Sequence, residues 1–223
     1  MDQAQEKQIF EWMVAKLYTG VICDTMDELG FRNQAMRENI RPLPDAGKQP
    51  IVGRAKTILS VDVFHVPDNP YELEIKAVDS ILPGEIVVAG TNRSVNNGFW
   101  GELLSTASKM RGAHGAIIDG LIRDTQKIAE LGFPVYCAGI KPVDSRGRGR
   151  VIDYDCPIVV GDVKVHPGDI VFADFDGVAV IPQNIFSQVA EMALDKVNRE
   201  NHTREMLLEG SYLRDVYEKY GVL

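Results

Sequence analysis

An arginine and an aspartate are neighbours at Arg123 and Asp124, directly after residues 116–122, which are almost entirely apolar. A guanidinium can grip a carboxylate with two parallel hydrogen bonds, and a carboxylate is a preferred ligand of hard divalent cations. Side by side, the two side chains could polarise an anionic keto acid with the help of a metal ion. The alternative is structural: Asp124 would only cap the helix that follows, and Arg123 would be a surface charge.

The position of the pair favours the chemical interpretation. Residues 116–119 read as a buried strand that ends in a turn at Gly120, and a helix is expected over residues 125–131. Arg123 and Asp124 therefore emerge at the end of a strand, which is where open α/β sheets place their ligands.

A second candidate is the segment Gly101–Leu104, which follows a glycine-containing loop and begins a predicted helix. The first amides of a helix lack internal partners and lie at the positive end of its dipole, so they can bind a carboxylate. Alternatively, the segment is a simple turn in which Glu102 complements the dipole. If Glu102 faces Asp124, the two could organise a metal and its waters, because magnesium commonly takes only one or two protein carboxylates.

Other motifs offer little chemistry. Residues 145–150 form the only basic cluster and are expected to be a mobile solvated loop, although they could contact an anionic substrate. The histidines show no metal-ligand spacing, no serine lies in a GxSxG elbow, and no GxGxxG follows an early strand. The cysteines form no CxxC pair and are expected to be small buried hydrophobes: Cys23, Cys137 and Cys156.

The elements that must position these residues alternate through the middle of the chain. Hydrophobic spacing predicts helices over residues 3–17, 19–30, 70–78, 101–110 and 125–131, and extended segments over 51–63, 85–89, 116–119 and 134–137. Asn69 is expected to cap the third helix, with Pro70 at its first position. This alternation indicates an α/β layer structure.

Towards the end of the sequence, the alternation of helices and strands gives way to a series of short strands. Short strands are predicted over residues 158–160, 163–165, 170–173 and 178–181, separated by glycine-containing turns, and they read as a β-meander. A long helix is expected from about Gln183, and Ser211 is expected to cap a final helix.

Bulk properties restrict the classes of function. The chain has 223 residues and a formal net charge of −8, without a linker or a break in composition, so a single domain over residues 1–223 is expected. A nucleic-acid-binding surface usually carries a basic patch, so an acidic chain is not expected to bind nucleic acid. The first residues lack the pattern of a signal peptide, and no apolar run is long enough to span a bilayer, so no membrane partner and a cytoplasmic location are expected.

In their order along the chain, four segments resemble those of the RraA-like family, which includes 4-hydroxy-4-methyl-2-oxoglutarate aldolases and the protein regulator of ribonuclease E. They are residues 101–104, 115–124, 167–171 and 174–182. The resemblance runs from about residue 20 to 200. It implies a swivelling β/β/α layered sandwich with a long C-terminal helix, in a homotrimer or homohexamer whose active sites lie at subunit contacts.

The resemblance also implies roles for single residues. Arg123 would bind the keto-acid carboxylate and keto oxygen, and Asp124 would ligate Mg²⁺ or Mn²⁺. Glu102 stands where aldolase members carry an acid that acts through water, and Glu200 is the best match for an acid from a neighbouring subunit. The backbone amides that would share the substrate are those of Gly101, Glu102, Leu103 and Leu104.

The implied activity is that of a metal-dependent class II pyruvate aldolase. It would cleave a 4-hydroxy-2-keto acid of the 4-hydroxy-4-methyl-2-oxoglutarate type and decarboxylate oxaloacetate as a side reaction. The alternatives are a regulator that binds ribonuclease E and a related lyase or hydratase of sugar-acid-derived keto acids. The methyltransferase label used for some members has no support, because no S-adenosylmethionine-binding glycine loop follows an early strand.

Overall fold

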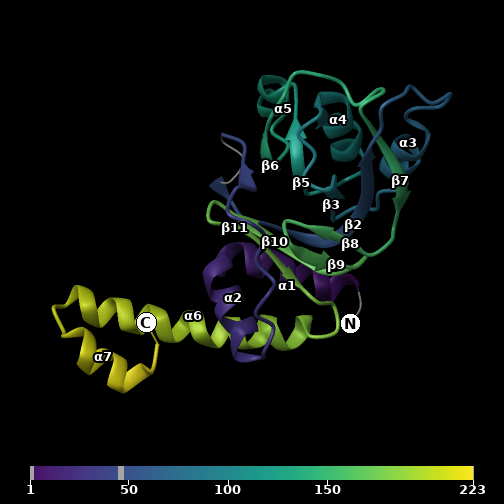
Figure 1. Ribbon diagram of the computed structural model, residues 1–223. Coiled ribbons are helices and arrows are strands. Elements are labelled where there is room, and N and C mark those ends of the chain that lie inside the picture. Colours follow the sequence, from purple (N-terminus) through teal and green to yellow (C-terminus); the bar gives the residue numbers. More distant parts are fainter. Residues whose placement is uncertain (1–2, 45–47, 223) are drawn as a thin grey trace.

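A mixed β-sheet forms the centre of the protein in the computed structural model, which describes residues 3–44 and 48–222 (Figure 1). Its strand order is β1-β6-β5-β3-β2-β10-β11, with β4 beside β5 and β7 beside β2. The strands are β1 (Arg41–Pro42), β2 (Ile51–Asp62), β3 (Glu85–Gly90), β4 (Gly98–Trp100), β5 (Gly115–Ile122), β6 (Val135–Ile140), β7 (Gly149–Tyr154), β10 (Ile170–Asp174) and β11 (Gly177–Ile181). Because β2, β3, β5 and β6 run parallel, their carboxyl ends share one edge of the sheet.

Helices cover this sheet in two groups. The helices α3 (Glu72–Asp79), α4 (Glu102–Met110) and α5 (Thr125–Leu131) pack on one part of it. The helices α1 (Gln3–Lys16), α2 (Thr19–Glu28) and α6 (Phe186–Leu208) pack against β10 and β11, on the opposite side of the molecule (Figure 1). The last helix, α7 (Leu213–Tyr220), folds back along α6.

A third core lies between the sheet and a separate hairpin, β8 (Ile158–Val160) and β9 (Val163–Val165). The hairpin β10–β11 shows how one strand pair serves two cores. Ile170 and Phe172 point into the helical core, while Val171 and Ala173, which alternate with them, point towards β8 and β9. Successive side chains of a strand alternate between its faces, so both faces of β10 must be apolar.

Most predicted elements are confirmed with small shifts of their ends, including the long helix near the C-terminus and the α/β layering. The four short strands after residue 157 also form, but they make two hairpins in two sheets rather than one meander. Two predicted caps are wrong. No side-chain cap is found for α3, which begins after Tyr71 rather than at Pro70, or for α7, where Tyr212 rather than Ser211 holds the cap position.

The strand before Arg123 is longer than predicted, because Gly120 lies inside β5 and not in a turn. A β-carbon on Gly120 would lie 2.3 Å from Oγ1 of Thr91, so glycine is required here by the close approach of a neighbouring loop. In the described residues, no helix has the length and apolar character needed to cross a membrane.

Candidate functional site

The two predicted site segments lie side by side because of strand β4, where the sequence had indicated only a loop. β4 pairs with β5 in parallel, and the backbone N–H of Arg123 donates to the carbonyl oxygen of Trp100 at 2.8 Å. The chain then enters α4 from β4 and α5 from β5. The Gly101–Leu104 helix start and the Arg123–Asp124 pair therefore meet at the carboxyl edge of the sheet, as the strand-end argument expected.

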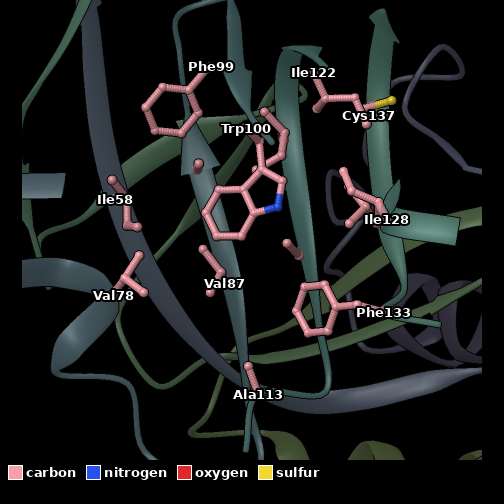
Figure 2. Packing of buried hydrophobic residues seen from close by; sticks show 14 of the residues in the cluster. Ile58, Val78, Val87, Phe99, Trp100, Ala113, Ile122, Ile128, Phe133 and Cys137 are labelled. Carbon is pink, nitrogen blue, oxygen red and sulfur yellow. The ribbon is translucent and has the colours of Figure 1, made fainter. Parts of the chain in front are cut away.

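Trp100 anchors this edge to the hydrophobic core. Its side chain is fully buried between the sheet and the helices, among Val87, Ile122 and Ile128 (Figure 2). Its indole N–H donates to Oγ of Ser105 at 2.8 Å, and that hydroxyl donates to the carbonyl oxygen of Gly101 at 3.0 Å. The first turn of α4 is thus tied to a side chain that cannot move without opening the core.

Asp124 occupies the cap position of α5 but does not cap it with its side chain, so the structural alternative for this residue is wrong. Its backbone is left-handed, with φ of 59°, which aspartate tolerates better than most residues. The carboxylate instead accepts a hydrogen bond from the backbone N–H of Glu102 at 3.3 Å. Asp124 therefore joins the start of α4 to the end of β5.

Two glycines allow this close packing. A β-carbon on Gly101 would lie 2.7 Å from Oδ2 of Asp124. A β-carbon on Gly98 would lie 2.3 Å from the carbonyl oxygen of Lys141, which belongs to the backbone. The first obstacle is the movable end of a side chain, whereas the second is fixed, so the two glycines protect different things: the site and the fold.

Arg123 faces a third carboxylate, Asp144, which the sequence did not single out. Nη2 of Arg123 lies 3.1 Å from Oδ1 of Asp144, and Nε lies 3.7 Å from Oδ2 of Asp124. The hydroxyl of Tyr71 donates to Oδ2 of Asp144 at 2.5 Å. Within the described residues, none of the guanidinium N–H groups of Arg123 donates a hydrogen bond, so they remain available to a ligand.

The charges around Arg123 shift the pKa values of the acids beside it. Burial alone would raise the pKa of Asp144, but the Tyr71 hydroxyl and the Arg123 charge bring it below its usual value. Glu74 in α3 is buried, and this burial, with repulsion from Asp144, raises its pKa to about 7, although Arg123 opposes the shift. Burial and the bond to Asp144 raise the pKa of Tyr71 to about 12. At neutral pH, Asp144 is therefore charged and Glu74 is partly protonated.

The remaining predicted residues are placed as follows. Glu102 contacts Asp124 through its backbone, while its carboxylate accepts from Oγ1 of Thr106 at 2.8 Å. In the described part of the chain, the backbone N–H groups of Leu103 and Leu104 have no hydrogen-bond partner, and the side chain of Leu103 is exposed. The carboxylate of Glu200, on α6, accepts from the hydroxyl of Tyr18, and α6 lies on the opposite side of the molecule from α4 and α5.

The donor set at this edge fits a hydrated cation rather than one enclosed by protein. Searching the described residues gives no group of three histidine, cysteine or acidic side chains placed to hold a metal. Asp124 has a half-exposed carboxylate that accepts one long hydrogen bond, so it keeps lone pairs for a cation. Magnesium commonly binds to one or two protein carboxylates and retains several waters.

A large cleft lies elsewhere, at the opposite edge of the sheet. It has a volume of about 1140 Å³ and is bordered by α1, the start of β2 and the turn at Pro83 and Gly84. Each guanidinium nitrogen of its arginine, Arg54, donates a hydrogen bond, either to Glu6 or to the carbonyl oxygen of Gly168. We therefore place the candidate site by its free donors and not by its volume.

Outside the site, two predictions need correction. Residues 145–150 are not a free loop, because Gly149 and Arg150 belong to β7 and the carbonyl oxygen of Ser145 accepts two backbone hydrogen bonds. Of the three cysteines, which are all free thiols, only Cys137 is fully buried.

Comparison with known proteins identifies the family of the chain. The family model described as RraA-like, Aldolase/RraA, matches residues 19–180. A *Halalkalibacterium halodurans* protein with the provisional name 4-hydroxy-4-methyl-2-oxoglutarate aldolase is 28% identical over 195 residues, which cover 87% of this chain and 86% of that protein. Protein DlpA of *Legionella pneumophila* is 27% identical over 205 residues, 89% of this chain, but this chain spans only 32% of DlpA.

A solved structure supports the fold expected from the resemblance. RraAS2 of *Streptomyces coelicolor*, described as an unusual member of the RNase ES inhibitor RraA protein family, superposes with a TM-score of 0.77 at 26% identity. The match covers 88% of this chain and 96% of that one. The predicted α/β fold is thereby confirmed.

Proposed function

Because this chain belongs to the RraA-like family, we propose that it is a divalent-metal-dependent pyruvate aldolase. Its substrate would be a 4-hydroxy-2-keto acid of the 4-hydroxy-4-methyl-2-oxoglutarate type, and oxaloacetate decarboxylation would be a side activity. The observation that carries the proposal is the guanidinium of Arg123, whose N–H groups donate no hydrogen bond within the described residues. It stands beside the unpaired amides of Leu103 and Leu104, and together these groups suit a carboxylate next to a keto oxygen.

The reaction breaks the bond between C3 and C4 of the substrate. The 4-hydroxyl gives up its proton as C4 becomes a carbonyl, and the bonding electron pair moves to C3, which forms the enolate of pyruvate. Protonation of C3 then completes pyruvate. Loss of carbon dioxide from oxaloacetate leaves the same enolate, so one site can serve both reactions. Arg123 supplies a fixed positive charge where negative charge develops on the keto oxygen.

Asp124 is the residue that would hold the cation, with Glu102 close by. When bound, a divalent ion supplies Lewis acidity at the keto oxygen. Glu102 is the acid of α4, and its carboxylate could hold a water for proton transfer from the 4-hydroxyl while Oε1 accepts from Thr106.

An acid from a second subunit would complete the site. Glu200 belongs to α6, on the opposite side of the molecule from α4 and α5, so it could contribute only in a homo-oligomer, which we propose to be a trimer or a hexamer. In the isolated chain, Glu200 instead accepts from the hydroxyl of Tyr18.

The test is pyruvate release from oxaloacetate and from 4-hydroxy-4-methyl-2-oxoglutarate, with magnesium and with EDTA. We expect release from at least one substrate that stops on chelation and returns with added magnesium. Asp124→Asn should lose this metal-dependent release while its unfolding midpoint stays close to that of the wild type, because asparagine also tolerates left-handed backbone. No metal-dependent pyruvate from either substrate, or a fully active Asp124→Asn variant, would refute the proposal.

A regulatory function is the second candidate, favoured by the similarity to RraAS2. Under this proposal, the chain would bind a ribonuclease of the E type through its surface and would need no intact Arg123. A pull-down with wild type and Arg123→Gln separates the two functions. Equal capture of the ribonuclease by both proteins would support regulation, and no capture at micromolar concentration would exclude it.

A further inference from the structure

Asp144 and Tyr71 reach Arg123 from segments that are distant in the sequence. Tyr71 immediately precedes α3, Asp144 lies between β6 and β7, and Arg123 follows β5. The two oxygens of the Asp144 carboxylate are divided between these neighbours, with Oδ1 facing Arg123 and Oδ2 accepting from Tyr71. This arrangement fixes the orientation of the carboxylate, because rotation would break one contact or the other.

Hydrogen bonds hold the loop that carries Asp144 on both sides of this residue. The backbone N–H groups of Ser145 and Arg146 donate to the Asp144 carboxylate, and the N–H of Gly98 donates to the carbonyl oxygen of Val143 at 2.8 Å. Arg148 donates to the carbonyl oxygen of Asp144 at 3.2 Å. Asp144 is therefore a rigid partner, while Arg123 is a long side chain with several rotatable bonds.

We infer that Asp144, held by Tyr71, is the positioning residue that keeps the Arg123 guanidinium at the start of α4 with its N–H groups free for a ligand. The inference rests on the proposed function for the identity of the ligand, but not for the positioning itself. A lone arginine with a third of its side chain exposed would sample many rotamers, and binding would have to order them. Because Asp144 holds the guanidinium, most of this ordering of Arg123 takes place when the protein folds and not when the ligand binds.

The negative charge of Asp144 also offsets part of the positive charge of Arg123, while the guanidinium N–H groups stay free. Asp124 contributes less to positioning, since its Oδ2 is 3.7 Å from Nε of Arg123 and also accepts from Glu102. Loss of Asp144 should therefore loosen Arg123 more than loss of any other partner.

The experiment compares wild type with Asp144→Asn, Tyr71→Phe and the matched control Asp79→Asn. Asp79 and Arg111 form an exposed pair with the same atoms at the same 3.1 Å separation, away from the site. Oxalate, a stable mimic of the pyruvate enolate, is titrated calorimetrically in the presence of magnesium. In parallel, the ¹⁵N signal of Nε of Arg123, identified by its absence in Arg123→Lys, reports the mobility of the guanidinium without any ligand.

We expect Asp144→Asn to weaken oxalate binding about tenfold and to make the Arg123 signal mobile, with a smaller effect of Tyr71→Phe in the same direction. Asp79→Asn should change neither readout. An Arg123 signal in Asp144→Asn that is as restrained as in the wild type would overturn the inference, as would unchanged oxalate affinity.

The outcome is separable from that of the proposed function. A wild type that releases no pyruvate, combined with a mobile Arg123 in Asp144→Asn, would sink the aldolase proposal and support the positioning role. Release of pyruvate by the wild type, combined with an Arg123 signal that Asp144→Asn leaves unchanged, would support the aldolase proposal and refute the positioning role. Should Asp144→Asn unfold, Tyr71→Phe carries the same test with the carboxylate still present.

Discussion

Each of two opposite edges of the central sheet carries an arginine beside acidic side chains, and the two arginines are used differently. At the amino ends of β2 and β3, Arg54 donates through Nε and Nη2 to Glu6 and through Nη1 to Gly168, at the margin of the large cleft. At the carboxyl end of β5, Arg123 is balanced by Asp124 and Asp144 without donating to either. The first arginine is a structural clamp, and the second keeps its hydrogen-bonding capacity for a ligand.

The comparison teaches that space alone does not locate chemistry. The cleft beside Arg54 offers mostly satisfied polar groups, whereas the Arg123 edge combines free guanidinium donors, unpaired helix amides and a half-exposed carboxylate. Satisfied groups contribute to stability, and unsatisfied groups near a surface contribute to binding.

The largest difference between the two edges is expected when each arginine is replaced by glutamine in a separate variant. Under the aldolase proposal, we expect Arg123→Gln to lower kcat/KM for pyruvate release by at least about 100-fold, because the fixed charge at the keto oxygen is lost. Arg54→Gln should leave kcat/KM unchanged and lower the free energy of unfolding by on the order of 1 kcal/mol. Steady-state kinetics measures kcat/KM and chemical denaturation measures the free energy of unfolding of both variants. Equal loss of activity in the two would contradict the division of roles.

The two glycines of the site edge should separate fold from function in the same way. Gly98→Ala would place a β-carbon 2.3 Å from the backbone oxygen of Lys141, and we expect it to cost about 2 kcal/mol of stability or more. Gly101→Ala would meet only movable side chains, those of Asp124 and Arg123, so it should reduce activity about tenfold with little change in stability. Denaturant unfolding of both variants gives the answer, and a reversed order of stabilities would refute this account.

Glu74 should make the site edge sensitive to pH. Its pKa is raised from 4.5 in the unfolded chain to about 7 in the folded protein, so the folded state holds the proton more tightly. The stability that Glu74 provides is complete below pH 4.5 and is lost as the pH rises through about 7. Glu74→Gln should remove this loss and raise the free energy of unfolding at pH 8 by on the order of 2 kcal/mol.

The neighbouring Glu72 serves as the control for that prediction. Its bond to Lys76 lowers its pKa, so its stabilising effect should be lost as the pH falls, in the opposite direction. Unfolding curves of Glu74→Gln and Glu72→Gln between pH 4 and pH 8 compare the two. A wild-type stability profile that Glu74→Gln leaves unchanged would show that the pKa of Glu74 is ordinary.

The smallest effect is expected from Leu82, an exposed side chain at the border of the large cleft. Leu82→Ser removes little buried surface, so we expect the free energy of unfolding to change by less than about 0.5 kcal/mol. Pyruvate release should also be unchanged. A marked loss of activity would bring the cleft into the function and would reverse our choice between the two edges.

Much of the fold could be predicted from the sequence because hydrophobic periodicity is a local property. The helices α1, α4 and α5 and the strands β3 and β9 were expected close to their observed positions. The turn at Gly120 and the caps at Asn69 and Ser211 were wrong. In each case, a residue type that often forms a turn or a cap was used for packing or left unused, which depends on neighbours that are distant in the chain.

The site divides along the same line. Arg123, Asp124 and the start of α4 were indicated by local sequence, since a charged pair after an apolar strand and a glycine before a helix are visible without a structure. Asp144, Tyr71 and Glu74 carry no local signal, because each is an ordinary residue in its own segment. They matter only through a juxtaposition of three distant segments that folding creates.

The amino-acid sequence alone thus determined which residues have chemical capacity, because side-chain type and local apolar pattern are written directly in it. The tertiary structure decided which of them act together. It made Asp124 a partner of α4 rather than a cap of α5, satisfied Arg54 and left the donors of Arg123 free. The physical reason is that partnership depends on distances between segments, and these are set by strand pairing and core packing rather than by spacing along the chain.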